Sequence, residues 1–531
     1  MTADTARRAI AIYGWGVVAP GASNMSEFEA LLERGETALR TTASNELGDA
    51  LFPVGDPVFD LETYRPWIEE RFGDARVQQL KSKMGDNALF AIGAFIQALG
   101  PSRKLESVLR ELDEQCHVLV GSGVGDLPQS YAARASLDKA VGAWNRFWSN
   151  PSRNTARKRH AESRHMPAGA APPTDPTTCE VDSDERHAAR IAWEAFWARH
   201  SDARAAFEVR YAEIERMPVG DDAEKGPLHA IRARERAHRK LMDETGCPTP
   251  PWEAVDPKLV WAIQNVPAAQ ITMLLGTHGA AWAPVAACST FGVALKCACD
   301  AIQRGEARAV VVGTCDPRPD PTLIAAFHRA RLAPALGRVN FPFTSLFGTH
   351  IAGGACVWII GDMEYCGAKG LSPVGPRIDG IAVSADAEHI ITPSASGPKH
   401  AIRRAMSDAS VLPADVALWE SHATGTPGDV SELKLTHDFV TPDTAIGAHK
   451  GLFGHGMANS GGWELTAMAL GLQRGRIAST GIAEASLHPW LRERYGHALV
   501  TQGRELRAGA GVKVMLGIGG VTACVVMRCA K

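Results

Sequence analysis

Short apolar runs alternate with amphipathic helical patterns along most of the chain. Runs typical of buried strands lie at residues 9–20, 116–125, 309–313, 353–361, 416–419, 512–520 and 524–527. Helical patterns lie between them, at 25–34, 86–99, 398–410 and 461–475. This alternation predicts an α/β fold whose sheets are covered by helices on both faces. The strand that runs into Gly14 and Gly16, and the region around Ile381, hint at two similar halves.

One long segment breaks the alternation. Trp144 and Trp148 fall at helical spacing, and two charged helical patterns follow at 184–217 and 228–244. We therefore expect a helical insertion over residues 127–256. It interrupts an N-terminal half formed by 8–126 and 257–362, and a C-terminal half follows over 371–531.

Composition excludes several classes of protein. The chain has 531 residues, of which 45% are hydrophobic and 22% charged, as in a globular protein. Its net charge of −3 does not indicate nucleic acid or an anionic membrane as a partner. No apolar run could span a bilayer, and the polar N-terminus lacks the core of a signal peptide, so we expect a cytoplasmic protein.

Cysteine usage points away from disulfides and metals. Eleven cysteines in a chain of this length do not suggest a disulfide framework, and most lie in apolar stretches. The pair Cys297 and Cys299 has a single residue between the thiols, and no second pair has zinc-ligand spacing. We expect no metal and no cofactor.

The stretch 282–303 carries the first candidate for chemistry. An apolar run ends at Cys288, and a helical pattern begins there. Unpaired backbone N–H groups and the helix dipole at such a turn favour a thiolate, and they can also stabilise an oxyanion. This is the setting of a nucleophilic cysteine, although an inert core cysteine also fits it.

Three further stretches carry reactive residues. His422 follows an apolar strand directly, in a loop rich in Thr, Gly and Asp. Lys450 and His455 lie five positions apart in a glycine-rich turn. The sequence Leu516-Gly-Ile-Gly-Gly520 is a strand broken by glycines, where a backbone can approach a ligand closely.

Together these motifs resemble those of the β-ketoacyl synthases, condensing enzymes of the thiolase fold. The four matching stretches are Ala287-Cys288-Ser-Thr, His422-Ala-Thr-Gly-Thr-Pro, Lys450 to His455, and Leu516-Gly-Ile-Gly-Gly520, in the family's order. The likeness covers roughly residues 8–125 and 259–527. It implies a thiolase-like α/β fold: two similar βαβαβαββ-type halves that form a five-layered α-β-α-β-α core.

The resemblance also implies catalytic roles. Cys288 would attack an acyl thioester, and the backbone N–H groups of Cys288 and Ile518 would form the oxyanion hole. His422 and His455, both neutral, would donate hydrogen bonds to a malonyl-type thioester as CO₂ leaves. Lys450 would orient this loop.

The remaining family positions are supporting ones. Lys450 would pair with Glu432, and the other supporting residues are Thr424, Thr426, Gly519 and Gly520.

Three departures from the family pattern indicate a specialised polyketide or fatty-acid-like synthase. The loop between Pro427 and Glu432 is one residue shorter than usual, which bears on the pairing with Lys450. Residues 352–355 lack the family's glutamate, and Ile518 replaces a phenylalanine.

Two alternatives to a condensing enzyme stay open. The chain could be an acyltransferase or thioester hydrolase that loads Cys288 without condensing, or a non-catalytic partner subunit. A thiolase is disfavoured. Thiolases that resemble this fold carry a second catalytic cysteine near the closing glycines, and here Cys524 lies beyond that place.

The expected partner is a separate acidic acyl carrier protein with its acyl and malonyl thioesters, since no carrier segment is visible. The basic stretch 153–165 is a hypothetical docking surface for it. The family also implies a homodimer, or a heterodimer with a related subunit.

Overall fold

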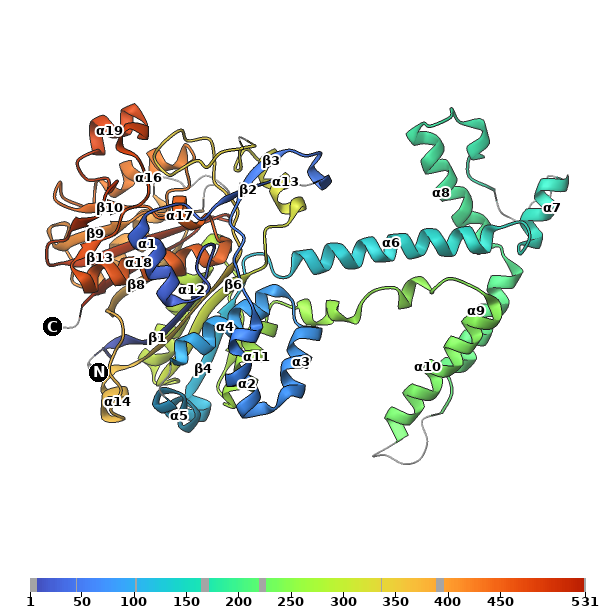
Figure 1. Ribbon diagram of the computed structural model, residues 1–531, viewed down its shortest axis with the longest axis horizontal. Helices are drawn as coiled ribbons and strands as arrows, with labels where there is room; N and C mark the ends of the chain where they lie inside the picture. Colours follow the sequence, from blue (N-terminus) through green and yellow to red (C-terminus); the bar gives the residue numbers. More distant parts are fainter. Residues whose placement is uncertain are drawn as a thin grey trace. The chain divides into compact units, whose positions relative to one another are not determined.

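The computed structural model describes residues 7–43, 45–100, 103–163, 171–218, 226–335, 337–387 and 396–529. The chain forms two compact units, one made of Met1–Pro128 and Val260–Lys531 and the other of Gln129–Leu259. Figure 1 labels their helices and strands. The candidate catalytic residues all belong to the first unit.

The first unit is built on ten strands in the order β10-β9-β13-β14-β8-β1-β7-β6-β4-β5. The strands are β1 (Ile10–Val18), β4 (Cys116–Gly121), β5 (Ala281–Trp282), β6 (Ala309–Asp316), β7 (Gly354–Asp362), β8 (Arg377–Ala385), β9 (Val416–Glu420), β10 (Ala445–Gly447), β13 (Ala510–Gly517) and β14 (Val521–Arg528). Two small antiparallel pairs lie outside this order: β2 (Arg40–Ala43) with β3 (Leu51–Val54), and β11 (Arg476–Ile477) with β12 (Arg504–Glu505).

Two half-sheets with the same strand pattern make up this order. In the first, β1–β7 and β7–β6 are antiparallel, whereas β6–β4 and β4–β5 are parallel. In the second, β8–β14 and β14–β13 are antiparallel, whereas β13–β9 and β9–β10 are parallel. The halves meet at a single pairing, Ala11 with Arg377, between β1 and β8. The two similar halves that the sequence hinted at are therefore confirmed.

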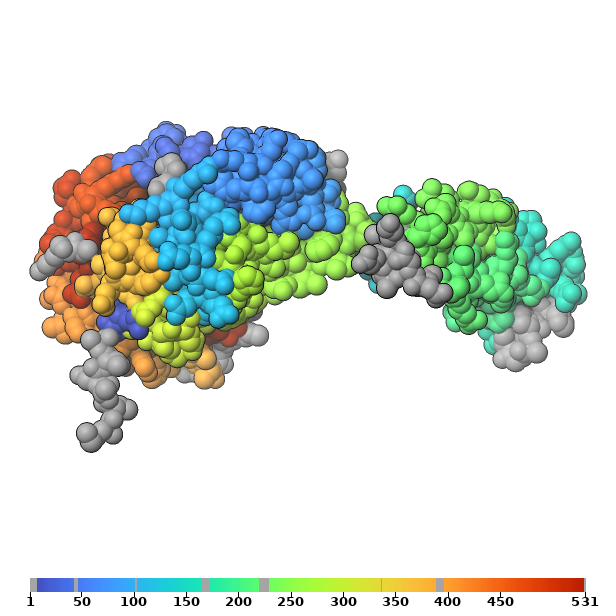
Figure 2. Space-filling model, turned by 90° about the horizontal axis from the view of Figure 1, so that it is seen from below, coloured from blue at the N-terminus to red at the C-terminus, as the bar shows by residue number. Residues whose placement is uncertain are grey.

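Helices cover both faces of each half-sheet (Figure 1). The central pair is α12 (Thr290–Arg304) and α18 (Ser460–Arg474). The outer helices are α4 (Asp86–Leu99), α5 (Arg103–Leu112) and α11 (Val266–Leu275) on the first half, and α15 (Gly397–Asp408) and α16 (Gly428–Thr436) on the second. The remaining helices of this unit are α1 (Met25–Arg34), α2 (Arg65–Phe72), α3 (Asp74–Lys83), α13 (Pro321–Arg329), α14 (Met363–Ala368), α17 (Lys450–Phe453) and α19 (Pro489–Tyr495). In Figure 2, α2, α3 and α5, blue to light blue, lie at the surface of this unit.

The side chains of β6 show why its sequence reads as a continuous apolar run. Val310 and Val312 pack with α12 and α18 in the central core. Val311, on the opposite face, packs with α4 and β4 in the outer core. Successive residues of a strand point to opposite faces, so a strand between two helical layers is apolar at every position. The α/β fold with both faces covered that the sequence predicts is confirmed.

The second unit is helical. It contains α6 (Leu127–Ser149), which begins in the first unit, α7 (Thr155–Ser163), α8 (Asp184–Arg199), α9 (Asp202–Glu215) and α10 (Gly226–Thr245). Its core holds Trp144, Trp148 and Phe207, with ring centroids 5.4–5.7 Å apart. In neither unit is a described helix both long enough and apolar enough to cross a membrane.

The basic stretch of this unit is less open than the sequence suggests. The Arg157 guanidinium is half-buried and donates to the Ser149 carbonyl at 2.6 Å. The Arg153 guanidinium stacks over the Phe147 ring at 4.1 Å, and His165 lies outside the described residues. The carrier-docking hypothesis stays a prediction and rests on the exposed Arg153, Lys158 and Arg159.

Candidate active site

Cys288 lies in a short 3₁₀ turn, Ala287–Ser289, immediately before α12. Ala287 has a φ of +48°, a left-handed conformation that turns the chain sharply before the thiol. The Ser289 hydroxyl donates to the carbonyls of Met515 (3.1 Å) and Val521 (2.8 Å), which ties the turn to the hairpin of β13 and β14. The α-helix begins two residues later than the sequence predicts.

The thiol is buried and protonated at rest. Cys288 is 4% exposed. Burial raises its pKa to about 11, although the backbone N–H of Ile518 and the charge of Lys450 act in the opposite direction. The N–H groups of the turn thus lower the thiol pKa in the expected direction, but burial outweighs them. The cost of burying an anion exceeds the stabilisation that the turn provides.

Two backbone donors converge on this sulfur. The N–H groups of Ile518 and of Cys288 itself both interact with the thiol. Gly517 allows the close approach, since a Cβ there would lie 2.8 Å from the Ala286 carbonyl oxygen. Gly519 and Gly520, with φ of +97° and +75°, turn the chain from β13 into β14. The structure thus brings together the two predicted oxyanion-hole groups.

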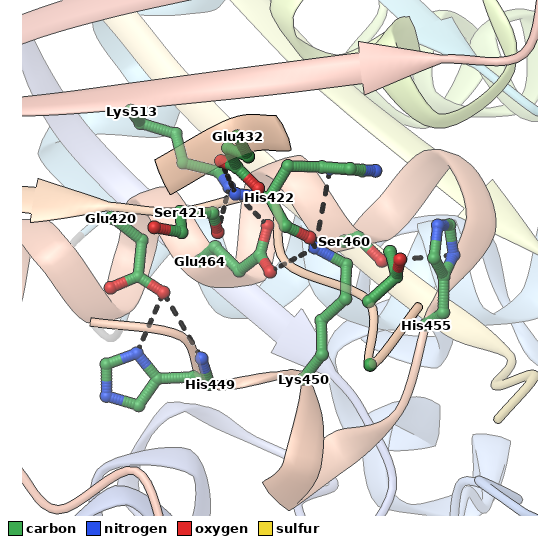
Figure 3. Close-up of polar contacts among 12 residues, drawn as sticks. Glu420, Ser421, His422, Glu432, His449, Lys450, His455, Ser460, Glu464 and Lys513 are labelled. Atoms are coloured by element: carbon green, nitrogen blue, oxygen red, sulfur yellow. Dashed lines mark hydrogen bonds and ion pairs between the residues drawn. The ribbon is translucent and has the colours of Figure 1, made fainter. Parts of the chain in front are cut away.

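His422 follows β9 and is fixed from three sides (Figure 3). Its N–H donates to Glu432 Oε1 at 2.6 Å, and its carbonyl accepts from the Lys450 ammonium. Lys450 Nζ also lies 3.4 Å from His422 Nδ1. An ammonium has no lone pair to offer, so Nδ1 is the acceptor and the ring proton sits on Nε2.

His455 is held in the same tautomer by different neighbours. The Met457 N–H donates to His455 Nδ1 at 3.1 Å, which leaves the proton on Nε2. Its backbone is fixed by bonds to His350 and Ala352, at 2.7 and 2.9 Å. The rings of His422 and His455 lie 5.7 Å apart, nearly perpendicular.

Both histidines are neutral. Burial lowers the pKa of His455 to about 3, and the charge of Lys450 adds to this effect. The same two causes, in the same order, hold the pKa of His422 well below its ordinary value. Two buried imidazoles with Nε2–H donors can therefore hydrogen-bond an oxygen that gains negative charge.

The predicted pairing of Lys450 with Glu432 is wrong. The Lys450 ammonium bonds Glu464 Oε1, at 2.5 Å, in the second turn of α18. Glu432 instead accepts the N–H of His422, which fits the loop after His422 being one residue shorter than in the family. Burial raises the pKa of Glu432 to about 7.

The predicted supporting residues Thr424 and Thr426 shape the loop after His422. Their hydroxyls lie 3.0 Å apart, and the N–H groups of Thr424 and Gly425 donate to Asp429 at 2.8 and 3.0 Å. Asp429 is 1% exposed and was not a candidate from sequence. It also accepts from the Phe343 N–H at 2.9 Å.

A second buried aspartate, also missed, holds the loop that carries His455. Asp316 Oδ2 accepts from the Ala458 N–H at 2.8 Å, and Oδ1 accepts from Ser122 and Gly123 at 2.7 and 2.9 Å. Burial raises the pKa of Asp316 to about 6. A strand-ending aspartate in an apolar run was the available sequence signal.

Three more buried charged groups surround the histidine loop. Glu420 Oε1 lies 2.9 Å from His449 Nδ1, and the ammonium of Lys513 lies 2.7 Å from Glu464 Oε2 (Figure 3). His449, expected to be structural or exposed, is buried. Lys513 and Glu420 each interrupt or end an apolar strand, which was the signal that sequence analysis passed over. Across the described ranges, no group of three potential ligands could hold a metal ion.

Two family models match the chain: "Beta-ketoacyl synthase, N-terminal domain" over residues 220–359 and "Beta-ketoacyl synthase, C-terminal domain" over 376–482. The chain is 29% identical over 294 residues to 3-oxoacyl-[acyl-carrier-protein] synthase 2 of Staphylococcus aureus, which covers 53% of this chain and 70% of the relative. It is 27% identical over 254 residues to nodulation protein E of Rhizobium meliloti, covering 47% and 61%.

Solved structures share the fold. The ishigamide ketosynthase/chain length factor has a TM-score of 0.64 at 17% identity, over 99% of this chain and 100% of that one. A ketosynthase in complex with its chain length factor from Xenorhabdus doucetiae has a TM-score of 0.63 at 15% identity, over all of both chains. The predicted thiolase-like fold is confirmed. The relatives favour condensation over the two alternatives that the sequence left open.

The raised thiol pKa makes a prediction about reactivity. We expect the rate at which iodoacetamide alkylates Cys288 to keep rising between about pH 9 and 11, because the thiolate forms only there. The folded chain is alkylated at each pH and then digested, and peptide mass spectrometry measures the rate. The Cys288→Ala variant identifies the peptide that carries Cys288. A free cysteine, with a pKa of about 8.5, is the reference. An alkylation rate of Cys288 that stops rising at the same pH as that of the free cysteine, or at a lower pH, would contradict the buried, protonated thiol.

Proposed function

The chain belongs to the β-ketoacyl synthase family, and we propose that it condenses a Cys288-bound acyl group with a malonyl-type thioester held on a carrier protein. One observation carries this proposal. Two neutral histidines with their protons on Nε2, His422 and His455, share a buried site with a thiol and two backbone donors. This set fits a reaction that creates negative charge on a thioester oxygen.

The first step transfers the acyl group. The Cys288 sulfur attacks the carbonyl of an acyl thioester, a sulfur–carbon bond forms, and the carrier thiol leaves with the proton. The oxygen of the tetrahedral intermediate accepts from the N–H groups of Cys288 and Ile518. Because burial raises the thiol pKa, the proton must leave the sulfur as the bond forms.

The second step creates the nucleophile. The malonyl thioester oxygen accepts hydrogen bonds from Nε2–H of His422 and His455. The bond to the carboxylate breaks, CO₂ leaves, and its electron pair becomes an enolate on that oxygen. Neutral donors suit this step, since they stabilise the enolate without protonating its carbon.

The third step forms the carbon–carbon bond. The enolate carbon attacks the carbonyl of the acyl-cysteine, whose oxygen again accepts from Cys288 and Ile518. The carbon–sulfur bond then breaks, Cys288 leaves as a thiolate that regains a proton from water, and the product leaves as a β-ketoacyl thioester on the carrier. Lys450 positions His422 through its bonds to the His422 carbonyl and Nδ1.

The acyl carrier protein is the proposed partner. The name of the synthase relative supports it, and we expect the carrier to be a separate protein. The polyketide or fatty-acid-like product stays a prediction from the departures in sequence, as does a cytoplasmic location.

Intact-protein mass spectrometry tests the condensation directly. We expect an acyl adduct on the wild type after incubation with acyl-carrier thioesters, and none on Cys288→Ala. Added malonyl-carrier protein should remove the adduct and yield CO₂ and a β-ketoacyl product. In His455→Ala the adduct should still form. The rate of product formation should fall by at least about 10²-fold, because one enolate donor is lost.

Two outcomes would overturn the proposal. An adduct that turns over only to a free acid or to a transferred acyl group, without a new carbon–carbon bond, would favour a hydrolase or acyltransferase. The absence of any adduct would favour a non-catalytic subunit.

A homodimer through the β5 edge is the proposed assembly. β5 ends the ten-stranded order and pairs only with β4 among the described strands, so its other side is free to pair with a second copy. The apolar side chains of Trp282, Val285 and Met273 are 43%, 51% and 57% exposed around it. The alternative is a heterodimer with a related subunit.

Light scattering after size-exclusion chromatography distinguishes these assemblies. We expect the wild type alone to have twice the chain mass of 56.7 kDa. Trp282→Lys should shift it toward the monomer, because a charge would be buried at the pairing edge. Leu412→Lys, which changes an apolar side chain 69% exposed on the C-terminal half, is the matched control and should stay dimeric. A monomeric wild type would contradict the homodimer.

A further inference from the structure

Lys513 is a fully buried cation for which the proposed reaction has no role so far. It lies in the middle of β13. Among the described residues, the largest fully buried side chains are aromatic except for Lys513. Its ammonium donates to the Ser421 carbonyl at 2.9 Å and pairs with Glu464 Oε2 at 2.7 Å. Buried lysines are rare unless paired, so both contacts call for an explanation.

Glu464 is shared between two lysines. Lys450 takes one carboxylate oxygen and Lys513 takes the other, and all three side chains are buried (Figure 3). Two ammonium groups around one carboxylate leave an excess of positive charge. The carboxyl group of Glu432 interacts with both lysines but offsets this charge only in part, because burial favours its protonated form.

The excess charge reaches both catalytic histidines. The charges of Lys450 and Lys513 both lower the pKa of His422 and of His455, after the larger effect of burial. The Ser421 carbonyl that Lys513 binds belongs to the residue directly before His422. Lys513 therefore fixes the end of β9 and at the same time supplies charge behind the two donors.

The other ionisable groups around this cluster have their own partners. Burial favours the neutral form of His449, but the Glu420 carboxylate and its hydrogen bond raise the His449 pKa overall. Asp429 accepts backbone N–H bonds from Phe343 and, in the loop after His422, from Thr424 and Gly425. The described ionisable groups around Lys513 and the histidines are Cys288, Asp316, Glu420, His422, Asp429, Glu432, His449, Lys450, His455, Glu464 and Cys524.

We propose that Lys513 is a positioning residue for decarboxylation: with Lys450 it clamps Glu464, and its positive charge adds to burial in favouring the neutral donor form of His422 and His455. The inference rests on the proposed condensation. Lys513 is buried beneath the histidine loop, so it acts through Glu464, the Ser421 carbonyl and its charge. The same charge favours the enolate as negative charge builds on the thioester oxygen.

The pH profile of CO₂ release from malonyl-carrier protein tests this role. Without Lys513, the pKa values of His422, His455, Glu432 and Lys450 all rise, because the Lys513 charge lowers each of them. In Lys513→Met we therefore expect the acidic and the basic limb of the rate–pH profile to shift to higher pH, by about one pH unit. The rate of CO₂ release at neutral pH should be lower. Lys513→Arg, which keeps the charge, should restore the limbs toward the wild-type positions. Lys399→Met removes a surface lysine paired with Asp438 and should leave the profile unchanged.

A second measurement does not depend on catalysis. The free energy of unfolding of the full chain is measured in urea from pH 5 to 8. Loss of Lys513 raises the folded-state pKa of Glu432 further above the unfolded value, because the Lys513 charge favours the Glu432 carboxylate. The folded state then binds more protons than the unfolded state in this window, so stability should fall more steeply with rising pH than in wild type. Lys513→Gln, which keeps a donor toward the Ser421 carbonyl, serves if Lys513→Met does not fold.

The outcomes separate this inference from the proposed reaction. In Lys513→Met, the pH profile of CO₂ release and the pH dependence of the free energy of unfolding could both stay unchanged. Lys513 would then be a packing residue, even if the overall rate fell, and the inference would be overturned. A wild type that releases no CO₂ at any pH would contradict the proposed function, and the stability slope would still decide the role of Lys513.

Discussion

The site depends on one carboxylate, Glu464, held between two buried ammonium groups. Each ion alone would be costly to bury, and breaking such a pair by removing one partner typically costs about 3–5 kcal/mol. Held together, the three charges fix Lys450 against His422 and leave net positive charge in a site closed to water. That arrangement fixes the tautomer of His422, because Lys450 occupies its Nδ1. It also adds to the burial that keeps both imidazoles neutral, because a positive neighbour disfavours an imidazolium.

The duplicated fold brings these groups together from distant parts of the chain. The central helices α12 and α18 pack between the half-sheets. The turn before α12 presents Cys288, and the second turn of α18 presents Glu464. Strand ends supply the rest: β9 leads to His422, and the hairpin of β13 and β14 brings the Ile518 N–H to the thiol. Close packing of small residues, such as Gly517 against the nucleophile turn, allows these approaches.

Sequence reasoning recovered what local patterns encode. Continuous apolar runs identify strands buried on both faces, as β6 illustrates, and the motifs at Cys288, His422 and His455 mark turns that the fold brings together. It failed where the answer depends on tertiary surroundings. The thiol pKa is set by burial, which a motif does not show. The partner of Lys450 depends on which helix passes nearby. A role for Lys513 can be inferred only from its ion pair with Glu464, which lies 49 positions earlier in the chain. Whether the resting histidines are neutral likewise follows from burial and from charges that separate elements contribute.

The protonation state of the two histidines is the central claim, and nitrogen NMR of the ¹⁵N-histidine-labelled full chain measures it directly. Comparison with His422→Ala and His455→Ala assigns the two rings. The account predicts that each ring, from about pH 6 to 8, carries one proton on Nε2 and an unprotonated Nδ1, because burial and Lys450 hold both pKa values below this range. An imidazolium signal, or a proton on Nδ1 of either ring, in that range would contradict it.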